Sequence, residues 1–162
     1  AFLSYNDIGA REPGVPWADD GTVEKEIREA RKNADIVIVA PHWGVEYVTQ
    51  PSPRQRELAR LMIDAGADVI IGNHPHWIQP VEFYKGKFII YAHGNFVFDQ
   101  EWSEETKVGI VGRYTFFEGN LVDVEYMPVR IVGYGQPYFL EGSQKNDLLK
   151  TMESASKALS GH

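Results

Sequence analysis

Two short apolar runs on either side of a well-delimited helix pattern constrain the fold of this chain more than any other feature. The runs are DIVIVA, which ends before Pro41, and DVII, which ends before Gly72. The segment between them, residues 52–66, begins with a capping-box pattern and a proline at the first helical position, and it ends in glycine. Apolar runs without alternation suit strands covered on both faces. Strands joined by a crossover helix are parallel, so we expect both strands to end at one edge of the same sheet.

The rest of the chain predicts one more strand, two more helices and two hairpins. AFLSYND predicts a strand at the start, and residues 22–34 predict a helix with Thr22 as its N-cap. One hairpin is expected to turn at residues 85–86 and a longer one at residues 118–120, and residues 143–159 predict a final helix. The first half alternates helix and strand, whereas the second half is mostly antiparallel. We therefore expect an α/β domain with a mixed sheet and helices outside it.

Composition excludes several classes of function. The 162 residues carry a formal net charge of −7, which argues against nucleic acid as the main partner because phosphate binding needs a basic face. The sequence contains no apolar run of ~18 residues, so no membrane span is expected in this chain. It contains no cysteine, which excludes disulfides, thiolate metal sites and cysteine nucleophiles. Neither a P-loop nor a GxGxxG pattern occurs, and no serine stands in a recognisable His/Asp arrangement.

Three of the five histidines follow the two apolar runs. His42 comes directly after the first strand and its proline, and His74 and His76 follow the second, separated by Pro75. A residue before proline favours an extended conformation, in which positions i and i+2 point to the same side, so we expect the two imidazoles to be presented together. Imidazole suits Zn, Fe, Mn or Ni, and paired metals ~3.5–4 Å apart bind phosphoryl groups in many hydrolases. The alternative is that these histidines only hydrogen-bond loop backbone.

Four further residues are weaker candidates. Glu46 either accepts a hydrogen bond from an imidazole or is a solvated loop acid. Asn73 either ligates a metal or accommodates a left-handed turn. His93 and Asn95 follow another apolar strand and either reach the site or belong to a turn. With histidine ligands alone, the site would carry little negative charge and bind metal weakly.

The segment from HWGVEY to GNFVFDQ resembles a known family. Together with the intervening PSPRQRELARLMIDAGADVIIGNHPHWIQPVEFYKGKFIIYAH, it is similar to the CapA-type poly-γ-glutamate capsule-synthesis family of the calcineurin-like metallophosphoesterase superfamily. The similarity runs from about residue 2 to about residue 137 and is densest from 41 to 100. The resemblance implies a four-layer α-β-β-α fold with two mixed sheets packed face to face. It makes residues 1–140 the C-terminal portion of such a domain and residues 141–162 a C-terminal helix and frayed tail.

The resemblance also implies a metal centre. His42 is similar to the superfamily's isolated metal-binding histidine, and His74 and His76 are similar to its Gly-x-His-x-His pair, with Gly72 as the glycine. The complete domain is expected to hold two divalent ions, of Mn, Zn, Fe or Ni.

The remaining site residues divide by their expected roles. Catalytic roles are expected for His76 and Asn73. Glu46, His93 and Asn95 are expected to support the cofactor, with Asn95, part of the GNF signature, structural or pocket-lining.

One departure from the family pattern concerns the N-terminal side. The family's Gly-Asp, Asn-Leu-Glu and Asn-Asn-His motifs, which supply the other ligands, do not occur before Ala1. We therefore expect a fragment, a cleavage product or a shortened relative that lacks roughly the first ~100 residues of a domain of typical size. Its partner would be the missing N-terminal portion or another chain, which would cover the edge of the sheet.

The resemblance favours a metal-dependent hydrolase-like domain of poly-γ-glutamate capsule synthesis. The expected substrate is an anionic polymer or a phosphoester, and the expected location is the cell surface or extracellular space. The alternative is a non-catalytic component that binds or assembles polyglutamate for synthesis or export. A third hypothesis is an α/β fragment with no metal site.

Overall fold

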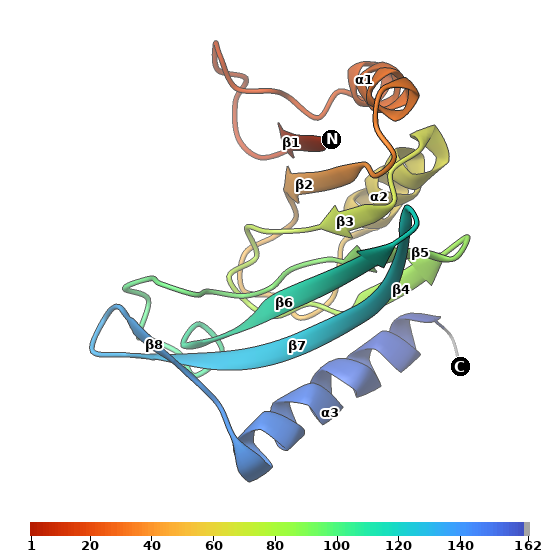
Figure 1. The fold of residues 1–162 in the computed structure, drawn as a ribbon. Coiled ribbons are helices and arrows are strands. Elements are labelled where there is room, and N and C mark those ends of the chain that lie inside the picture. Colours follow the sequence, from red (N-terminus) through yellow and green to blue (C-terminus); the bar gives the residue numbers. More distant parts are fainter. Residues whose placement is uncertain (161–162) are drawn as a thin grey trace.

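The computed structural model describes residues 1–160, which form a five-stranded sheet, a three-stranded sheet and three helices (Figure 1). The elements follow in the order β1 (Phe2–Asn6), α1 (Asp20–Lys32), β2 (Ile38–His42), α2 (Pro53–Ala65), β3 (Val69–Ile71), β4 (Val81–Tyr84), β5 (Lys87–Ile90), β6 (Val108–Phe117), β7 (Asn120–Val132), β8 (Gln136–Phe139) and α3 (Gly142–Ser160). The expected α/β class with mixed strand directions is thus confirmed.

The five-stranded sheet has the strand order β1-β2-β3-β5-β4. The pairs β1–β2, β2–β3 and β3–β5 are parallel, and the edge strand β4 runs antiparallel to β5. The predicted crossover is confirmed, because β2 and β3 pair in parallel with Val39 opposite Ile70. The arrowheads of β1, β2 and β3 point the same way in Figure 1, so the loops that follow these strands lie at one end of the molecule.

The two helices of the first half begin at side-chain caps. Helix α2 has the predicted capping box, in which Ser52 and Gln55 bond each other's backbone N–H, and Pro53 is its first residue. The prediction of Thr22 as the N-cap of α1 is wrong. The cap is Asp19, whose carboxylate accepts a hydrogen bond from the Thr22 N–H and thereby satisfies a free donor of the first turn.

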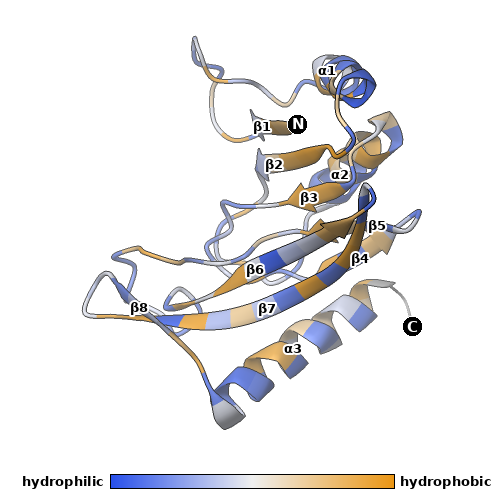
Figure 2. Cartoon of the chain, viewed as in Figure 1, coloured by the Kyte–Doolittle hydropathy of each residue, from blue (hydrophilic) through white to orange (hydrophobic). Residues whose placement is uncertain are grey.

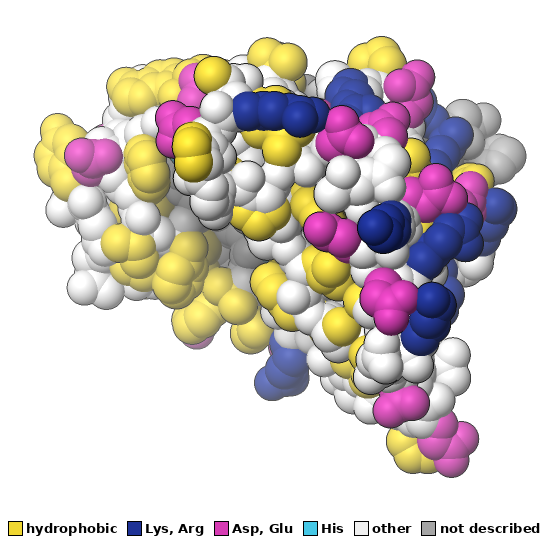
Figure 3. Space-filling model, turned by 90° about the horizontal axis from the view of Figure 1, so that it is seen from above, with side chains coloured by type: hydrophobic (Ala, Val, Ile, Leu, Met, Phe, Trp, Pro, Cys, Tyr) yellow, Lys and Arg dark blue, Asp and Glu magenta, His cyan; other side chains and the backbone are white. Residues whose placement is uncertain are grey.

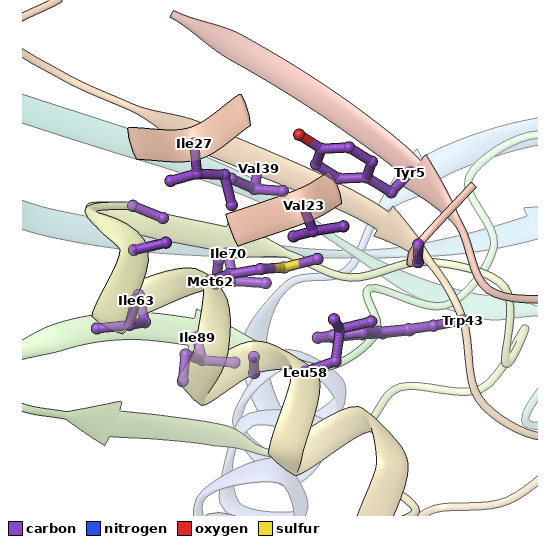
Figure 4. Packing of buried hydrophobic residues seen from close by; sticks show 14 of the residues in the cluster. Tyr5, Val23, Ile27, Val39, Trp43, Leu58, Met62, Ile63, Ile70 and Ile89 are labelled. Carbon is purple, nitrogen blue, oxygen red and sulfur yellow. The ribbon is translucent and has the colours of Figure 1, made fainter. Parts of the chain in front are cut away.

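The main core lies between α1, α2 and one face of the five-stranded sheet (Figure 4). Val23 and Ile27 of α1 and Met62 of α2 are fully buried against Val39 and Ile70. Each such side chain contributes about 1.5–3 kcal/mol relative to full exposure. Helical spacing therefore places the apolar faces of both helices on the sheet.

The opposite face of this sheet packs against the second sheet. Val69, Phe88 and Ile90 are buried there with side chains of β6 and β7, including Tyr114 and Tyr126. Burial on both faces explains the absence of alternation in the apolar runs, and β3 and the first part of β2 are hydrophobic in Figure 2.

The second sheet has the order β6-β7-β8, and all its pairs are antiparallel. The long hairpin turns at Glu118 and Gly119, both with positive φ, as predicted. A backbone bridge between Gly94 and Gly109 joins this sheet to the loop that follows β5, and the Ile110 N–H donates to the His93 carbonyl at 2.8 Å.

Helix α3 lies against β4 and β7 (Figure 1). Met152 is its buried anchor, and the hydroxyl of Ser156 accepts a hydrogen bond from the Val81 N–H at 3.0 Å. Its other apolar side chains toward the sheets are half-buried: Leu148, Leu149, Ala155 and Leu159. The domain boundary at residue 140 and the four-layer order stay predictions, and the end of the expected tail, residues 161–162, lies outside the described residues. No helix within residues 1–160 combines the length and apolar character needed to cross a bilayer.

Candidate metal centre

The loops after β2 and β3 are adjacent, as the parallel crossover requires. His42 and Asn73 form a backbone bridge, with the Asn73 N–H donating to the Pro41 carbonyl at 3.0 Å. The imidazole centroids of His42 and His74 are 4.6 Å apart, and those of His74 and His76 are 5.9 Å apart. Histidines separated by 32 positions thus share one site at the end of the sheet.

The expected extended conformation of His74-Pro75-His76 is wrong. His74 has φ +100° and His76 has φ +61°, both in a region that non-glycine residues rarely adopt. The turn is held by the Tyr47 N–H, which donates to the Pro75 carbonyl at 2.9 Å. Backbone strain of about 1–3 kcal/mol at a residue persists only where the surroundings enforce it, and it concentrates at functional sites.

Glu46 joins the two histidines of this turn. One ligand atom each of Glu46, His74 and His76 lies within 4.8 Å of the others. Tetrahedral ligands at ~2.1 Å from one ion are ~3.4 Å apart, so the most distant of these atoms would have to approach each other by about 1 Å or more to bind a divalent ion. Glu46 is exposed and can make this adjustment. The donor set therefore contains a carboxylate as well as imidazoles, unlike the set expected from the sequence.

The environment keeps two of the imidazoles in the form that binds metal. Desolvation, and to a smaller extent the nearby His42, lowers the pKa of His74. Desolvation and then His76 lower the pKa of His42, even though much of the His42 side chain is exposed. Glu46 opposes both shifts without reversing them. Neutral rings at pH 7 leave a nitrogen lone pair free for an ion.

Asn95 contacts one of the candidate ligands, His76. It is buried, and its Oδ1 lies 2.9 Å from Nδ1 of His76. Asn73 is exposed and lines the pocket, with its Nδ2 donating to the Ile71 carbonyl at 3.2 Å.

His93 occupies a different place from the other histidines. Its Nδ1 lies 3.3 Å from the Gly72 carbonyl, and its Nε2 lies 2.9 Å from the hydroxyl of Tyr114. Burial lowers its pKa. Since both ring nitrogens are engaged, we do not include His93 in the ligand set.

The pocket at the centre has a volume of about 190 Å³. It is lined by His42, Asn73, His74, His76, Ala92, Gly94 and Asn95. A larger groove of about 810 Å³ lies elsewhere, between α2, β4 and α3, and is lined by apolar side chains and by charged side chains of both signs, Arg56, Arg60, Glu82, Glu153 and Lys157. It contains no histidine, so we place the candidate site in the smaller pocket, where the ligand chemistry is.

Aromatic side chains surround His76. Tyr47 stacks on its ring at 5.7 Å, and Phe98 lies 5.1 Å away. Trp102 packs edge-on against Tyr47 at 4.6 Å and is 60% exposed. Hydrophobic side chains gather toward the left end in Figure 3, the end to which β1–β3 point in Figure 1. No sequence pattern singled out Tyr47, because its contact with His76 joins two separate loops. The same holds for Gln100, whose hydrogen bonds are described below.

The chain is similar to known bacterial proteins. Residues 3–100 match the family described as "Bacterial capsule synthesis protein PGA_cap". The chain is 47% identical over 118 residues to the "PGA biosynthesis protein CapA" of Bacillus subtilis (strain 168), covering 68% of this chain and 31% of that protein. It is 41% identical over 135 residues to the "Capsule biosynthesis protein CapA" of Bacillus anthracis, covering 81% of this chain and 33% of that protein.

A more distant relative is a "Probable polyglutamine synthesis accessory protein" of Mycobacterium tuberculosis (strain ATCC 25618 / H37Rv). The identity is 31% over 128 residues, covering 70% of this chain and 31% of that protein. The chain therefore spans about a third of the length of the curated relatives that it matches.

Proposed function

Because the chain belongs to the bacterial capsule synthesis protein family PGA_cap, we propose that it is part of a metal-dependent hydrolase of poly-γ-glutamate capsule synthesis. Its substrate would be an anionic polymer or a phosphoester, and its place of action the cell surface. The names of the Bacillus relatives support the association with capsule and PGA biosynthesis.

The observation that carries the proposal is the convergence of Glu46, His74 and His76, with His42 beside them. A divalent ion bound by these groups would act as a Lewis acid on a substrate oxygen and acidify a coordinated water molecule. The imidazoles would hold the ion, Asn95 would orient His76, and Asn73 at the rim of the pocket would contact the substrate.

The pocket limits what can enter. The volume of about 190 Å³ is smaller than the ~300–1,000 Å³ of clefts that take up whole small-molecule ligands. One phosphate or carboxylamide group fits, whereas the rest of a polymer would lie outside, near the exposed ring of Trp102. This supports action on one linkage of a long substrate.

The complete domain requires more than this chain's ligands. The Glu46, His74 and His76 set accounts for one ion, and a second would need ligands from the remainder of the protein or from another chain. The metallophosphoesterase-like four-layer arrangement is part of the same proposal.

The first test is the metal content of the untagged chain beside that of a His74→Ala/His76→Ala double variant. Near-stoichiometric Zn, Mn, Fe or Ni in the wild type, lost in the variant while the thermal unfolding remains cooperative, is the expected result. Equal metal content in both proteins would refute the site.

The second test is hydrolysis by the full-length protein of a γ-glutamyl peptide and of a phosphodiester such as bis(p-nitrophenyl) phosphate. Turnover that requires the metal and disappears in His74→Ala is expected. Absence of turnover in a metal-loaded, folded protein would contradict the hydrolase proposal.

A non-catalytic role in binding or assembly is the second candidate. Within residues 1–160, the clustered donor set contains a single carboxylate. A divalent ion held there would keep a formal charge of +1, which suits retention of a carboxylate-rich polymer. Metal-dependent binding of polyglutamate without released product would favour this role.

A further inference from the structure

His76 and three other side chains form a closed circuit of hydrogen bonds and one ring contact. His76 Nδ1 lies 2.9 Å from Oδ1 of Asn95, and Nδ2 of Asn95 donates to Oε1 of Gln100 at 3.2 Å. Nε2 of Gln100 donates to the hydroxyl of Tyr47 at 3.1 Å. The Tyr47 ring stacks on the His76 ring with an interplanar angle of 23°, which closes the circuit. These residues come from three separate loops.

The circuit determines where the hydrogen on His76 lies. Nδ2 of Asn95 also donates to the backbone carbonyl of Thr106 at 2.9 Å, and a carbonyl can only accept. The Thr106 carbonyl and Oε1 of Gln100 together orient this amide, so Oδ1 faces His76. Because Oδ1 is itself an acceptor, His76 Nδ1 must carry the hydrogen. Nε2, which lies 3.7 Å from Oε1 of Glu46, is then the nitrogen with the free lone pair.

Gln100 is held firmly enough to support this arrangement. Its backbone carbonyl accepts a hydrogen bond from Oγ1 of Thr106 at 2.6 Å, and Thr106 is fully buried. The Thr106 N–H in turn donates a hydrogen bond to Oγ of Ser103 at 3.2 Å. Both N–H groups of the Asn95 amide thus have acceptors, so the network is satisfied around this buried side chain.

Tyr47 extends the circuit to the carboxylate ligand. Its backbone has φ +60°, and its N–H bonds the Pro75 carbonyl between the two histidines. Glu46 directly precedes it in the chain. The hydrogen bond from Gln100 to the Tyr47 hydroxyl therefore holds the residue that sets the position of Glu46.

We propose that Gln100 and Tyr47 are positioning residues that, through Asn95 and ring stacking, hold His76 with hydrogen on Nδ1 and Nε2 turned toward Glu46. The consequence for metal affinity rests on the proposed function above. The tautomer does not, because it is a property of the metal-free protein.

The decisive measurement is the tautomer of His76 by long-range ¹H–¹⁵N correlation in metal-free, ¹⁵N-histidine-labelled protein. It is made at about pH 8, above the ordinary pKa of histidine. Wild type should show hydrogen on Nδ1 of His76. Gln100→Leu should give a mixture of tautomers at His76. Hydrogen on Nε2 in the wild type, or an unchanged tautomer in a folded Gln100→Leu variant, would overturn the proposal.

Two conservative variants separate positioning from packing. Gln100→Glu keeps an oxygen that accepts from Asn95 and a second that accepts from the Tyr47 hydroxyl, so it should retain the wild-type tautomer. Tyr47→Phe keeps the stacked ring and loses only the hydroxyl, so it should show a smaller change than Gln100→Leu. Equal effects of Gln100→Glu and Gln100→Leu would contradict the hydrogen-bond circuit.

Calorimetric titration with Zn²⁺ gives the functional consequence. Loss of a direct outer partner of a ligating histidine typically lowers metal affinity ~10–100-fold, and for Gln100→Leu, which acts through Asn95, we expect the lower end of this range, ~10-fold. Gln144→Leu, at an exposed glutamine of α3, is the matched control and should leave the affinity unchanged. If wild type binds no Zn²⁺ while the tautomer still responds to Gln100→Leu, the metal function fails and the circuit stands. If Zn²⁺ binds but the tautomer does not respond, the circuit fails alone.

Discussion

The α-carbon of Gly72 faces the backbone carbonyl of Tyr91 so closely that a β-carbon at residue 72 would lie 2.0 Å from that oxygen. The indole Nε1 of Trp43, which donates to the same carbonyl at 2.9 Å, would be 2.6 Å from the added carbon. Gly72 directly precedes Asn73 and His74, so this close approach fixes the position at which the loop of the candidate metal centre begins.

Gly72→Ala should therefore lower the free energy of unfolding by about 3 kcal/mol or more, because a backbone carbonyl cannot move aside as a side chain can. Urea denaturation monitored by tryptophan fluorescence measures the change. Gly21→Ala, in the first turn of α1, is the control. The added carbon there meets nothing closer than 3.8 Å and should stabilise the helix by about 0.5–1 kcal/mol. Equal stability of the two variants would contradict the structure at Gly72.

Glu46→Gln should weaken binding of a divalent ion by more than the ~10–100-fold typical of outer-partner losses, because a charged ligand is removed. The fold should be unaffected, since Glu46 is exposed. Calorimetric titration with Zn²⁺ checks the affinity, and Glu57→Gln, on the exposed surface of α2, provides the matched control. Wild-type affinity in Glu46→Gln would remove this carboxylate from the ligand set.

Asp68 is the second site where a substitution should be costly. Its carboxylate is buried and accepts hydrogen bonds from Arg31 at 2.8 Å, Lys87 at 2.6 Å and the Val37 N–H at 2.8 Å. Asp68→Ala should destabilise by about 2–3 kcal/mol, because it leaves the buried Val37 N–H without an acceptor and removes the partner of two half-buried cations. Asp64→Ala removes an exposed pair with Lys85 and should change the stability little. A difference between the two variants below about 1 kcal/mol in chemical denaturation would argue against a buried role of Asp68.

Glu82 should contribute a pH dependence to stability. Burial alone would raise its pKa, but hydrogen bonds from Tyr91 at 2.6 Å and Arg60 at 2.7 Å outweigh burial and lower the pKa from its ordinary value of 4.5. A carboxyl whose pKa is lower in the folded state stabilises the fold fully above its ordinary pKa. That contribution is lost as the pH falls through the lowered value.

Glu82→Gln should therefore reduce stability near neutral pH by about 1.5–3 kcal/mol and flatten the decline in stability below pH 4.5. Urea denaturation from neutral to acidic pH measures both effects. Glu141→Gln, at an exposed carboxylate, should keep the wild-type profile. A parallel profile for Glu82→Gln and wild type would show that Glu82 makes no such contribution.

Much of the five-stranded sheet could be predicted from the sequence, because the patterns that specify its helices and strands are local. The capping box of Ser52 and Gln55 places the start of α2, and the parallel crossover that follows brings His42 and His74 together. The start of α1 was not predictable to the residue, since Asp19 and Thr22 both have side chains that cap helices and only the structure shows which one is used.

The details of the site could not be predicted because they depend on contacts between loops. The rule for residues before proline gave an extended His74, whereas the bond from the Tyr47 N–H to the Pro75 carbonyl holds a turn with positive φ. The sequence likewise left Glu46 as a solvated acid or an acceptor, because its approach to His76 results from that same turn.

Because of the backbone bridge between Gly94 and Gly109, we expect the candidate metal centre and the second sheet to unfold as one cooperative unit. A β-carbon at Gly109 would lie 1.9 Å from the carbonyl of Asn95, so β6 packs directly on the residue that orients His76. Detachment of the β6–β7 hairpin by a local fluctuation would remove the support of Asn95 at the same moment. Amide protons in the His93–Asn95 segment and in β6 should then share one opening free energy in hydrogen exchange, and occupancy of the site by an ion would slow exchange throughout the hairpin.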